Sequence, residues 1–167
     1  MGRFARWRRM VRTQQHRLRA ALHRIEEPDP LTGPAPSLNR IDALVEGFAA
    51  GQPVRWSLGG APRPLPGAVD VAAYRIIEES LADARRHAPG AAVAVRLRYD
   101  AEGVTIEVRD EGADAATPAG EPRGVRRGLA GVRGRAERVG GTFFAGPNPG
   151  GGFTVRAVLP APEEAAE

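Results

Sequence analysis

The stretch EESLADARRHA, residues 78–88, sets two carboxylates and several bases among apolar residues that recur at helical spacing. Residues four apart share a helix face, so Glu79 and Asp83 point the same way, with Arg86 and His87 just beyond. Such a pair is either a solvated helix face or a site for a metal ion and phosphates. The rest of the chain must decide between these two interpretations.

The spacing predicts a long amphipathic helix around this stretch, from Val69 to Ala88, ended by Pro89-Gly90. Its expected inward residues are Val71, Tyr74, Ile77, Leu81 and Ala84.

Shorter periodic segments lie on both sides of this helix. Ser37 is a candidate N-cap for a helix over residues 38–50, and a strand is expected over 53–60. Alternating apolar residues predict two hairpins, and a further helix is expected between them. The hairpin strands are expected at 93–99 with 104–108 and at 141–146 with 153–160, and the helix at 128–139. This order predicts an α+β fold, with one mixed, mostly antiparallel sheet and its helices on one face.

Composition excludes several classes of site. The 167 residues include no cysteine and only three histidines, so disulfides, thiolate metal sites and cysteine nucleophiles are excluded. No apolar run is long enough to span a membrane, and the basic N-terminus lacks the apolar core of a signal peptide. We therefore expect a cytoplasmic protein.

The N-terminal segment, residues 1–27, is strongly basic, since its first 25 residues carry eight arginines and no acidic residue. A heptad of apolar residues at Phe4, Val11, Leu18 and Ile25 predicts a basic amphipathic helix that forms a homodimer or packs on a partner. The alternatives are an arm folded back on its own domain, an anionic membrane surface, which is not the favoured interpretation, and disorder. No second basic patch with aromatic residues supports nucleic-acid binding.

The domain boundaries follow from these patterns. Residues 28–37 are predicted to be a proline-rich linker, 38–160 one domain and 161–167 a tail. Inside the domain, residues 112–127 form a Gly, Ala, Pro and Arg-rich stretch without periodicity, which is typical of a functional lid or a disordered loop.

Two further short motifs carry chemistry. RDEGAD, residues 109–114, places Asp110 at the end of a predicted strand, and RRGLAG, residues 126–131, opens a predicted helix with glycines. A helix N-terminus that a glycine backbone leaves accessible binds anions readily. Each motif alone is more often a simple turn.

Four stretches in this order resemble one family: YRIIEESLADARRHA, IEVRDEG, RGLAGVRGRAERVGGTF and GGGFTVRAVLP. They resemble the ATP-binding domain of two-component sensor histidine kinases, in the GHKL ATPase superfamily, and are nearest to its nitrate-sensor and lipid-fluidity-sensor type. The resemblance covers residues 38–160. It implies a Bergerat-type two-layer α/β sandwich with ATP and Mg²⁺ as cofactors.

The resemblance assigns roles to the acidic and basic residues of the first stretch. Glu79 matches the family's glutamate, a candidate base or polariser near the γ-phosphate and a candidate metal ligand. Asp83 stands where the family has its Mg²⁺-ligating asparagine. Arg86 and His87 match basic residues near the phosphates.

Further roles concern the base and the phosphate-binding backbone. Asp110 matches the aspartate that accepts a hydrogen bond from the adenine amino group, with Gly112 the glycine beside it. Thr154 matches a small polar position near adenine. The residues expected to approach the phosphates at the helix start are Gly128, Leu129 and Gly131.

The sequence departs from the family at several positions. Asp83 replaces the asparagine, Asp114 a glycine after the adenine aspartate, and Arg126 a glycine at the end of the lid. Neither His16 nor His23 has the context of a phosphoacceptor histidine. An acceptor histidine would therefore come from another chain.

Three functions fit this set of residues. The first is a histidine-kinase-type ATP-binding domain that acts in two-component signalling with a histidine kinase, response regulator or other signalling protein. The second is a nucleotide-binding pseudokinase that regulates a partner with little turnover, and the third is a serine kinase of the anti-sigma type. Whether ATP is turned over separates the first from the second.

Overall fold

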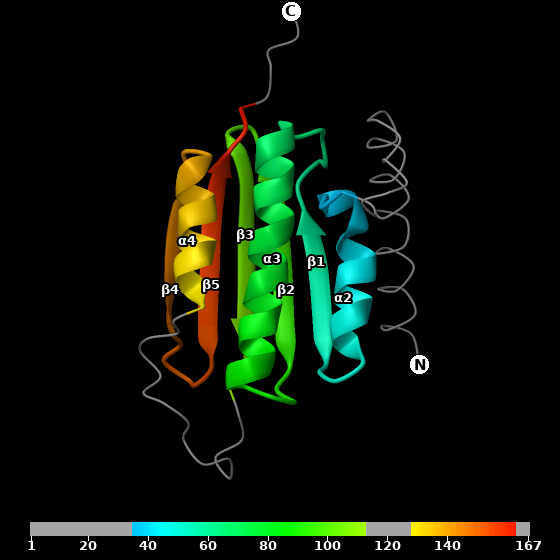
Figure 1. Ribbon diagram of the computed structural model, residues 1–167, viewed down its shortest axis with the longest axis vertical. Coiled ribbons are helices and arrows are strands. Elements are labelled where there is room, and N and C mark those ends of the chain that lie inside the picture. Colours follow the sequence, from blue (N-terminus) through cyan, green and yellow to red (C-terminus); the bar gives the residue numbers. More distant parts are fainter. Residues whose placement is uncertain (1–34, 113–127, 163–167) are drawn as a thin grey trace, which may run out of the picture.

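The computed structural model describes residues 35–112 and 128–162 (Figure 1). The predictions for the arm at 1–27, most of the linker and lid, and nearly all of the tail lie outside this part of the chain. In chain order, the described elements are η1 (Leu38–Arg40), α2 (Ile41–Ala49), β1 (Val54–Gly59), α3 (Gly67–His87), β2 (Val93–Asp100), β3 (Gly103–Asp110), α4 (Leu129–Arg138), β4 (Thr142–Pro147) and β5 (Phe153–Pro160).

The five strands form one mixed sheet in the order β1-β2-β3-β5-β4. β1 runs parallel to β2, and α3 connects the two, whereas the other three neighbouring pairs are antiparallel. Two tight hairpins join β2 to β3 and β4 to β5. The prediction of an α+β fold with a mostly antiparallel sheet is confirmed.

The helices α2, α3 and α4 lie side by side over one face of the sheet (Figure 1). Strand alternation explains this two-layer arrangement. Every second residue of β2, β3 and β5 is buried, and the residues between them, apart from Gly103, are exposed or half-buried. The fully buried side chains of the core come from both layers: Leu38, Ile41, Ile76, Ile77, Leu81, Leu97, Ile106, Leu159, Val93, Val95, Val104 and Val132.

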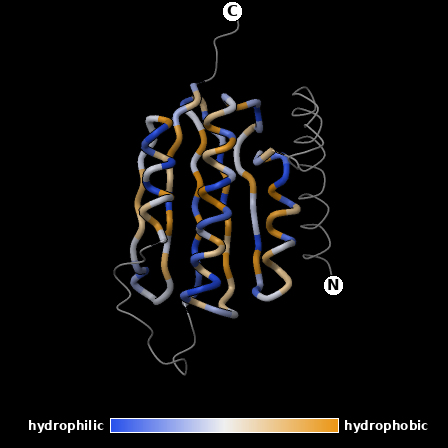
Figure 2. The backbone as a smooth tube through the Cα atoms, in the orientation of Figure 1, coloured by the Kyte–Doolittle hydropathy of each residue, from blue (hydrophilic) through white to orange (hydrophobic). Residues whose placement is uncertain are grey.

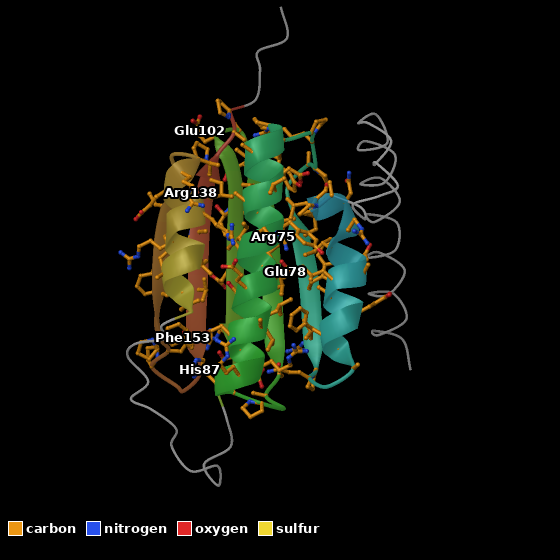
Figure 3. The ribbon with its side chains drawn as sticks, viewed as in Figure 1. Arg75, Glu78, His87, Glu102, Arg138 and Phe153 are labelled. Atoms are coloured by element: carbon orange, nitrogen blue, oxygen red, sulfur yellow. The ribbon has the colours of Figure 1, made fainter. Side chains whose placement is uncertain are left out.

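The predicted inward face of α3 was wrong at one residue. Val71 is 41% exposed, because it shares a helix face with Arg75 and Glu78. Those two form an ion pair at 2.6 Å, and Figure 3 labels both beside α3. The buried stripe of α3 contains Ile77, Leu81 and Ala84 as predicted, and also Ala73 and Ile76.

Polar contacts fix both ends of α3. At its start, the Asp70 carboxylate accepts a hydrogen bond from the Leu38 backbone N–H at 2.9 Å. At its end, the buried Gln52 side chain donates to the Ala88 carbonyl at 3.0 Å, which satisfies a group that a helix terminus leaves open. The predicted N-cap is also present, since Ser37 accepts from the Asn39 N–H at 3.3 Å.

One buried ionisable group lies in the core away from these helix ends. Burial raises the pKa of Tyr99 to about 12, with Asp70 adding to the shift and Arg63 opposing it. The Tyr99 hydroxyl has no hydrogen-bond partner in the described part of the chain. The neutral phenol is therefore the form that the fold accommodates.

Across residues 35–112 and 128–162, no helix combines the length and the apolar character needed to cross a membrane.

Candidate functional site

The residues predicted to carry chemistry gather at one end of the fold. The last turns of α3, the first turn of α4, the end of β3 and the start of β5 meet there, and Figure 3 shows His87 and Phe153 at this end, with Glu102 and Arg138 toward the other. Hydrophilic residues fill the last turns of α3 beside the site (Figure 2). The antiparallel register pairs Asp110 with Phe153, so the end of β3 and the start of β5 coincide.

Asp83 does not lie on a solvated helix face. Its side chain is only 3% exposed, and its Oδ1 lies 3.5 Å from His87 Nε2 one turn later on the same helix. Burying a carboxylate away from water costs free energy unless a nearby positive charge or a bound cation compensates it. Of the two interpretations of this stretch, a solvated helix face is therefore excluded for Asp83.

Glu79 is held by an arginine that the sequence interpretation missed. Arg135 on α4 donates to Glu79 Oε1 through Nε at 2.9 Å and through Nη2 at 2.5 Å. Both side chains are about one-third exposed, at 35% for Arg135 and 30% for Glu79. A guanidinium that uses two N–H groups on one carboxylate is a charge-assisted contact that fixes the orientation of the carboxylate.

The glycines that open α4 lie directly against the acidic and basic residues of α3. A Cβ placed on Gly128 would be 3.3 Å from Arg86 Nη1 and 3.4 Å from Asp83 Oδ1, and a Cβ on Gly131 would be 3.3 Å from Glu79 Oε2. Side chains at these two positions would press on the charged groups. The structure thus brings together Glu79, Asp83, Arg86, Gly128 and Gly131, while Leu129 is buried between the two glycines.

Asp110 ends β3 and is buried to 2% exposure. Its Oδ1 accepts a hydrogen bond from the Gly112 N–H at 3.0 Å. Gly112 has φ of +81° and packs on the backbone of Gly152, since a Cβ on Gly112 would lie 2.8 Å from the Gly152 nitrogen. The backbones of Gly112 and Gly152 approach too closely for side chains, and this packing fixes the turn that follows Asp110.

The structure does not bring Thr154 together with Asp110. Successive residues of a strand point to opposite faces, and Phe153, not Thr154, stands opposite Asp110 on the face that the helices cover. The Thr154 hydroxyl instead donates to the Asn148 side-chain oxygen at 2.6 Å. Phe153, which is 4% exposed, is therefore the residue of β5 that lies beside Asp110.

The donor set suits a magnesium ion that phosphates and water would complete. In the described residues no group of three or more His, Cys, Asp or Glu side chains could hold a metal ion. Mg²⁺ in nucleotide sites takes one or two carboxylates and obtains its other ligands from phosphates and water. Asp83 and Glu79, one turn apart on α3, could supply the one or two carboxylates that this pattern requires.

The family of this chain follows from a match to a known family model. A family model described as histidine kinase-, DNA gyrase B- and HSP90-like ATPase matches residues 68–163, which is more than half of the chain. The chain belongs to this ATPase family. The match contains α3, the end of β3 and the start of α4, so every element of the site lies within it. Membership supports an ATP-binding, histidine-kinase-like function of the GHKL superfamily.

Solved structures agree with this ATPase fold. The ATP-binding domain of PrrB from Mycobacterium tuberculosis is 27% identical and matches with a TM-score of 0.51 over 73% of this chain and 91% of its own. The histidine kinase domain of the blue-light activated histidine kinase from Erythrobacter litoralis EL346 is 17% identical, with a TM-score of 0.55 over 89% of this chain and 74% of its own. The second likeness shows the Bergerat fold alone. A search of curated proteins finds no match.

Proposed function

We propose that this ATPase-family chain binds Mg·ATP at the end of the fold where α3, α4 and β3 meet. The observation that carries the proposal is the contact of Gly128 with both Asp83 and Arg86. It joins a helix N-terminus, a buried carboxylate and a guanidinium, which are the groups that a magnesium triphosphate requires.

Asp110 would select the base. A buried carboxylate can accept a hydrogen bond from the exocyclic amine of adenine, whereas guanine presents a carbonyl oxygen at that position and would be repelled. The turn formed by Gly112 holds the carboxylate in place through its N–H. Phe153, paired with Asp110 across the sheet, supplies apolar surface next to the carboxylate.

The residues at the α3–α4 contact would hold the phosphates. Backbone N–H groups of the first turn of α4 are not used within the helix and carry the positive end of its dipole. The guanidinium of Arg86, and His87 when protonated, add positive charge beside them. Magnesium bound between the phosphates and Asp83 would neutralise charge on the triphosphate.

Phosphoryl transfer would need an acceptor from a partner. A histidine of another signalling protein is the acceptor that the histidine-kinase likeness favours, and Glu79 would orient or deprotonate it. A second function, a nucleotide-binding regulator with little turnover, is favoured by one specific observation. Two nitrogens of Arg135 hold Glu79 Oε1, so this carboxylate is engaged in a contact between helices and is not positioned on an acceptor.

Replacing Asp110 with Asn tests the proposal. An amide oxygen can still accept from the Gly112 N–H, but the amide NH₂ then meets the adenine amino group, so two donors face each other. We expect ATP affinity to fall by about 10- to 100-fold, the range for losing a hydrogen bond to a charged group. The matched control is Glu111→Gln, an exposed carboxylate one residue along that pairs with Arg55.

Calorimetric titration of the full chain with ATP and GTP, with and without Mg²⁺, gives the readout. The proposal predicts that the parent and the Glu111→Gln variant bind ATP in preference to GTP and that Asp110→Asn loses this preference. Equal ATP affinity in Asp110→Asn and the parent would remove Asp110 from the site.

A further inference from the structure

Arg135 and Glu79 form a contact between two helices that are far apart in the sequence. The guanidinium reaches Glu79 Oε1 through two nitrogens, Nε and Nη2, across 56 residues of chain. The second oxygen, Oε2, faces the backbone at Gly131, in the first turn of α4. Arg135 therefore neutralises charge at Oε1, and Oε2 is the oxygen that lies near the start of α4.

The position of Arg135 on α4 follows from its spacing. It lies four residues after Gly131, so both are on the same face of the helix. Gly131 leaves room for the carboxylate, and Arg135 reaches it from one turn further along. A larger residue at 131 would displace the Glu79 side chain, since a Cβ there already lies 3.3 Å from Oε2.

Each carboxylate at the α3–α4 contact has basic side chains beside it. His87 lies 3.5 Å from Asp83, Arg86 reaches the same start of α4, and Arg135 contacts Glu79. Two uncompensated carboxylates one turn apart would repel a triphosphate as it approached the α3–α4 contact. Repulsion between like charges a few ångströms apart is substantial where water is partly excluded.

We propose that Arg135 is the residue that lets this site accept a γ-phosphate, by cancelling the charge of Glu79. It is thus a specificity-determining residue for nucleoside triphosphates over diphosphates. The inference rests on the proposed function, in which the phosphates lie at the start of α4. It assigns Arg135 a role through Glu79 and not through contact with the nucleotide.

The expected effect concerns the ratio of ATP to ADP affinity. Removal of Arg135 leaves a net negative charge at Glu79 that a γ-phosphate meets and a diphosphate does not. With the side chains one-third exposed, solvent screening reduces the repulsion, and we expect the ATP preference over ADP to fall by about tenfold.

A double-mutant cycle tests this role. Dissociation constants for ATP and ADP, both with Mg²⁺, are measured by calorimetry on the full chain as the parent, Arg135→Gln, Glu79→Gln and the double variant. Arg138→Gln is the matched control, an exposed arginine in the last turn of the same helix, toward the opposite end from the site (Figure 3). Thermal unfolding of each variant establishes that it is folded.

We expect Arg135→Gln to lose about tenfold in ATP preference, the double variant to recover it, and Arg138→Gln to match the parent, because the repulsion disappears with the Glu79 charge. An unchanged ATP-to-ADP ratio in Arg135→Gln would overturn the inference while leaving the proposed function intact. A loss that Glu79→Gln does not restore would also overturn it, since Arg135 would then act on the phosphate itself. A parent that binds neither nucleotide would overturn the proposed function and this inference with it.

Discussion

Replacing Asp83 with Asn changes the charge at the centre of the site while keeping its shape. The carboxylate is buried, and its Oδ1 lies 3.5 Å from His87 Nε2. Asparagine retains one oxygen for a metal ion and adds an NH₂ donor that a phosphate oxygen can accept from. The variant should bind ATP more tightly and depend less on Mg²⁺.

The size of the effect follows from the burial of the side chain. One extra negative charge about 5 Å from a phosphate costs roughly 3 kcal/mol at an effective dielectric constant of 20, and under 1 kcal/mol in bulk water. Asp83 is withdrawn from water, but Arg86 and His87 offset part of its charge. We therefore expect ATP affinity to rise about tenfold, which corresponds to about 1.4 kcal/mol.

The assay is a titration with ATP at several Mg²⁺ concentrations, including excess chelator. Glu78→Gln is the matched control, because it makes the same charge change on the solvent side of the same helix, where Glu78 pairs with Arg75 (Figure 3). Identical ATP affinity and Mg²⁺ dependence in Asp83→Asn and the parent would refute the reasoning and separate Asp83 from the phosphates.

Three further predictions concern the frame around the site. Tyr99→Phe should match or exceed the parent in stability at pH 7, because it removes a buried hydroxyl without a partner in the described residues. Since the raised pKa favours the neutral phenol, the parent should lose about 2 kcal/mol of stability between pH 10 and pH 12 that the variant keeps, as urea unfolding at both pH values will measure. Gln52→Ala should lower the unfolding free energy by about 0.5–1.5 kcal/mol, because the Ala88 carbonyl loses one of its two donors and keeps the Ala91 N–H. Gln52→Glu, which cannot donate when ionised, should not restore the loss. Gly152→Ala should destabilise the chain by at least about 1–3 kcal/mol and weaken nucleotide binding, because its φ is +81° and its Cβ would lie 2.0 Å from the Asp110 carbonyl oxygen; wild-type melting behaviour in this variant would contradict the close packing of that turn.

Much of this fold could be predicted from periodicity. Alternation in β2 and β3 is clear, since every inward residue except Asp110 is apolar and most of those between are polar, so these two strands and their inward face were correctly expected. The inward face of α3 was predicted less well, because many of its buried residues are alanines, whose small side chains give a weak apolar signal. Val71, a strong signal, is exposed beside an ion pair.

The site was partly predictable for the same reason. Glu79, Asp83 and the two glycines of α4 lie in short local motifs, and local spacing places residues on a helix face. Arg135 could not be found in this way, because its contact with Glu79 joins two helices that are far apart in the sequence. Nothing in the local sequence distinguishes Arg135 from the other arginines among the 24 basic residues. The role of Thr154 stays a prediction that strand alternation does not favour, because Phe153 and Val155 share the buried face and Thr154 lies between them.

The central claim is that a nucleotide binds where α3, α4 and β3 meet. Its most direct test is to follow backbone amide signals of the glycines by NMR while a non-hydrolysable ATP analogue and Mg²⁺ are added to the full chain. The account predicts large shifts at Gly112, Gly128 and Gly131 and little change at Gly103 and Gly140, which lie at the opposite end of the fold. Saturable shifts confined to Gly103 and Gly140, or no saturable shift at any of the five, would contradict it.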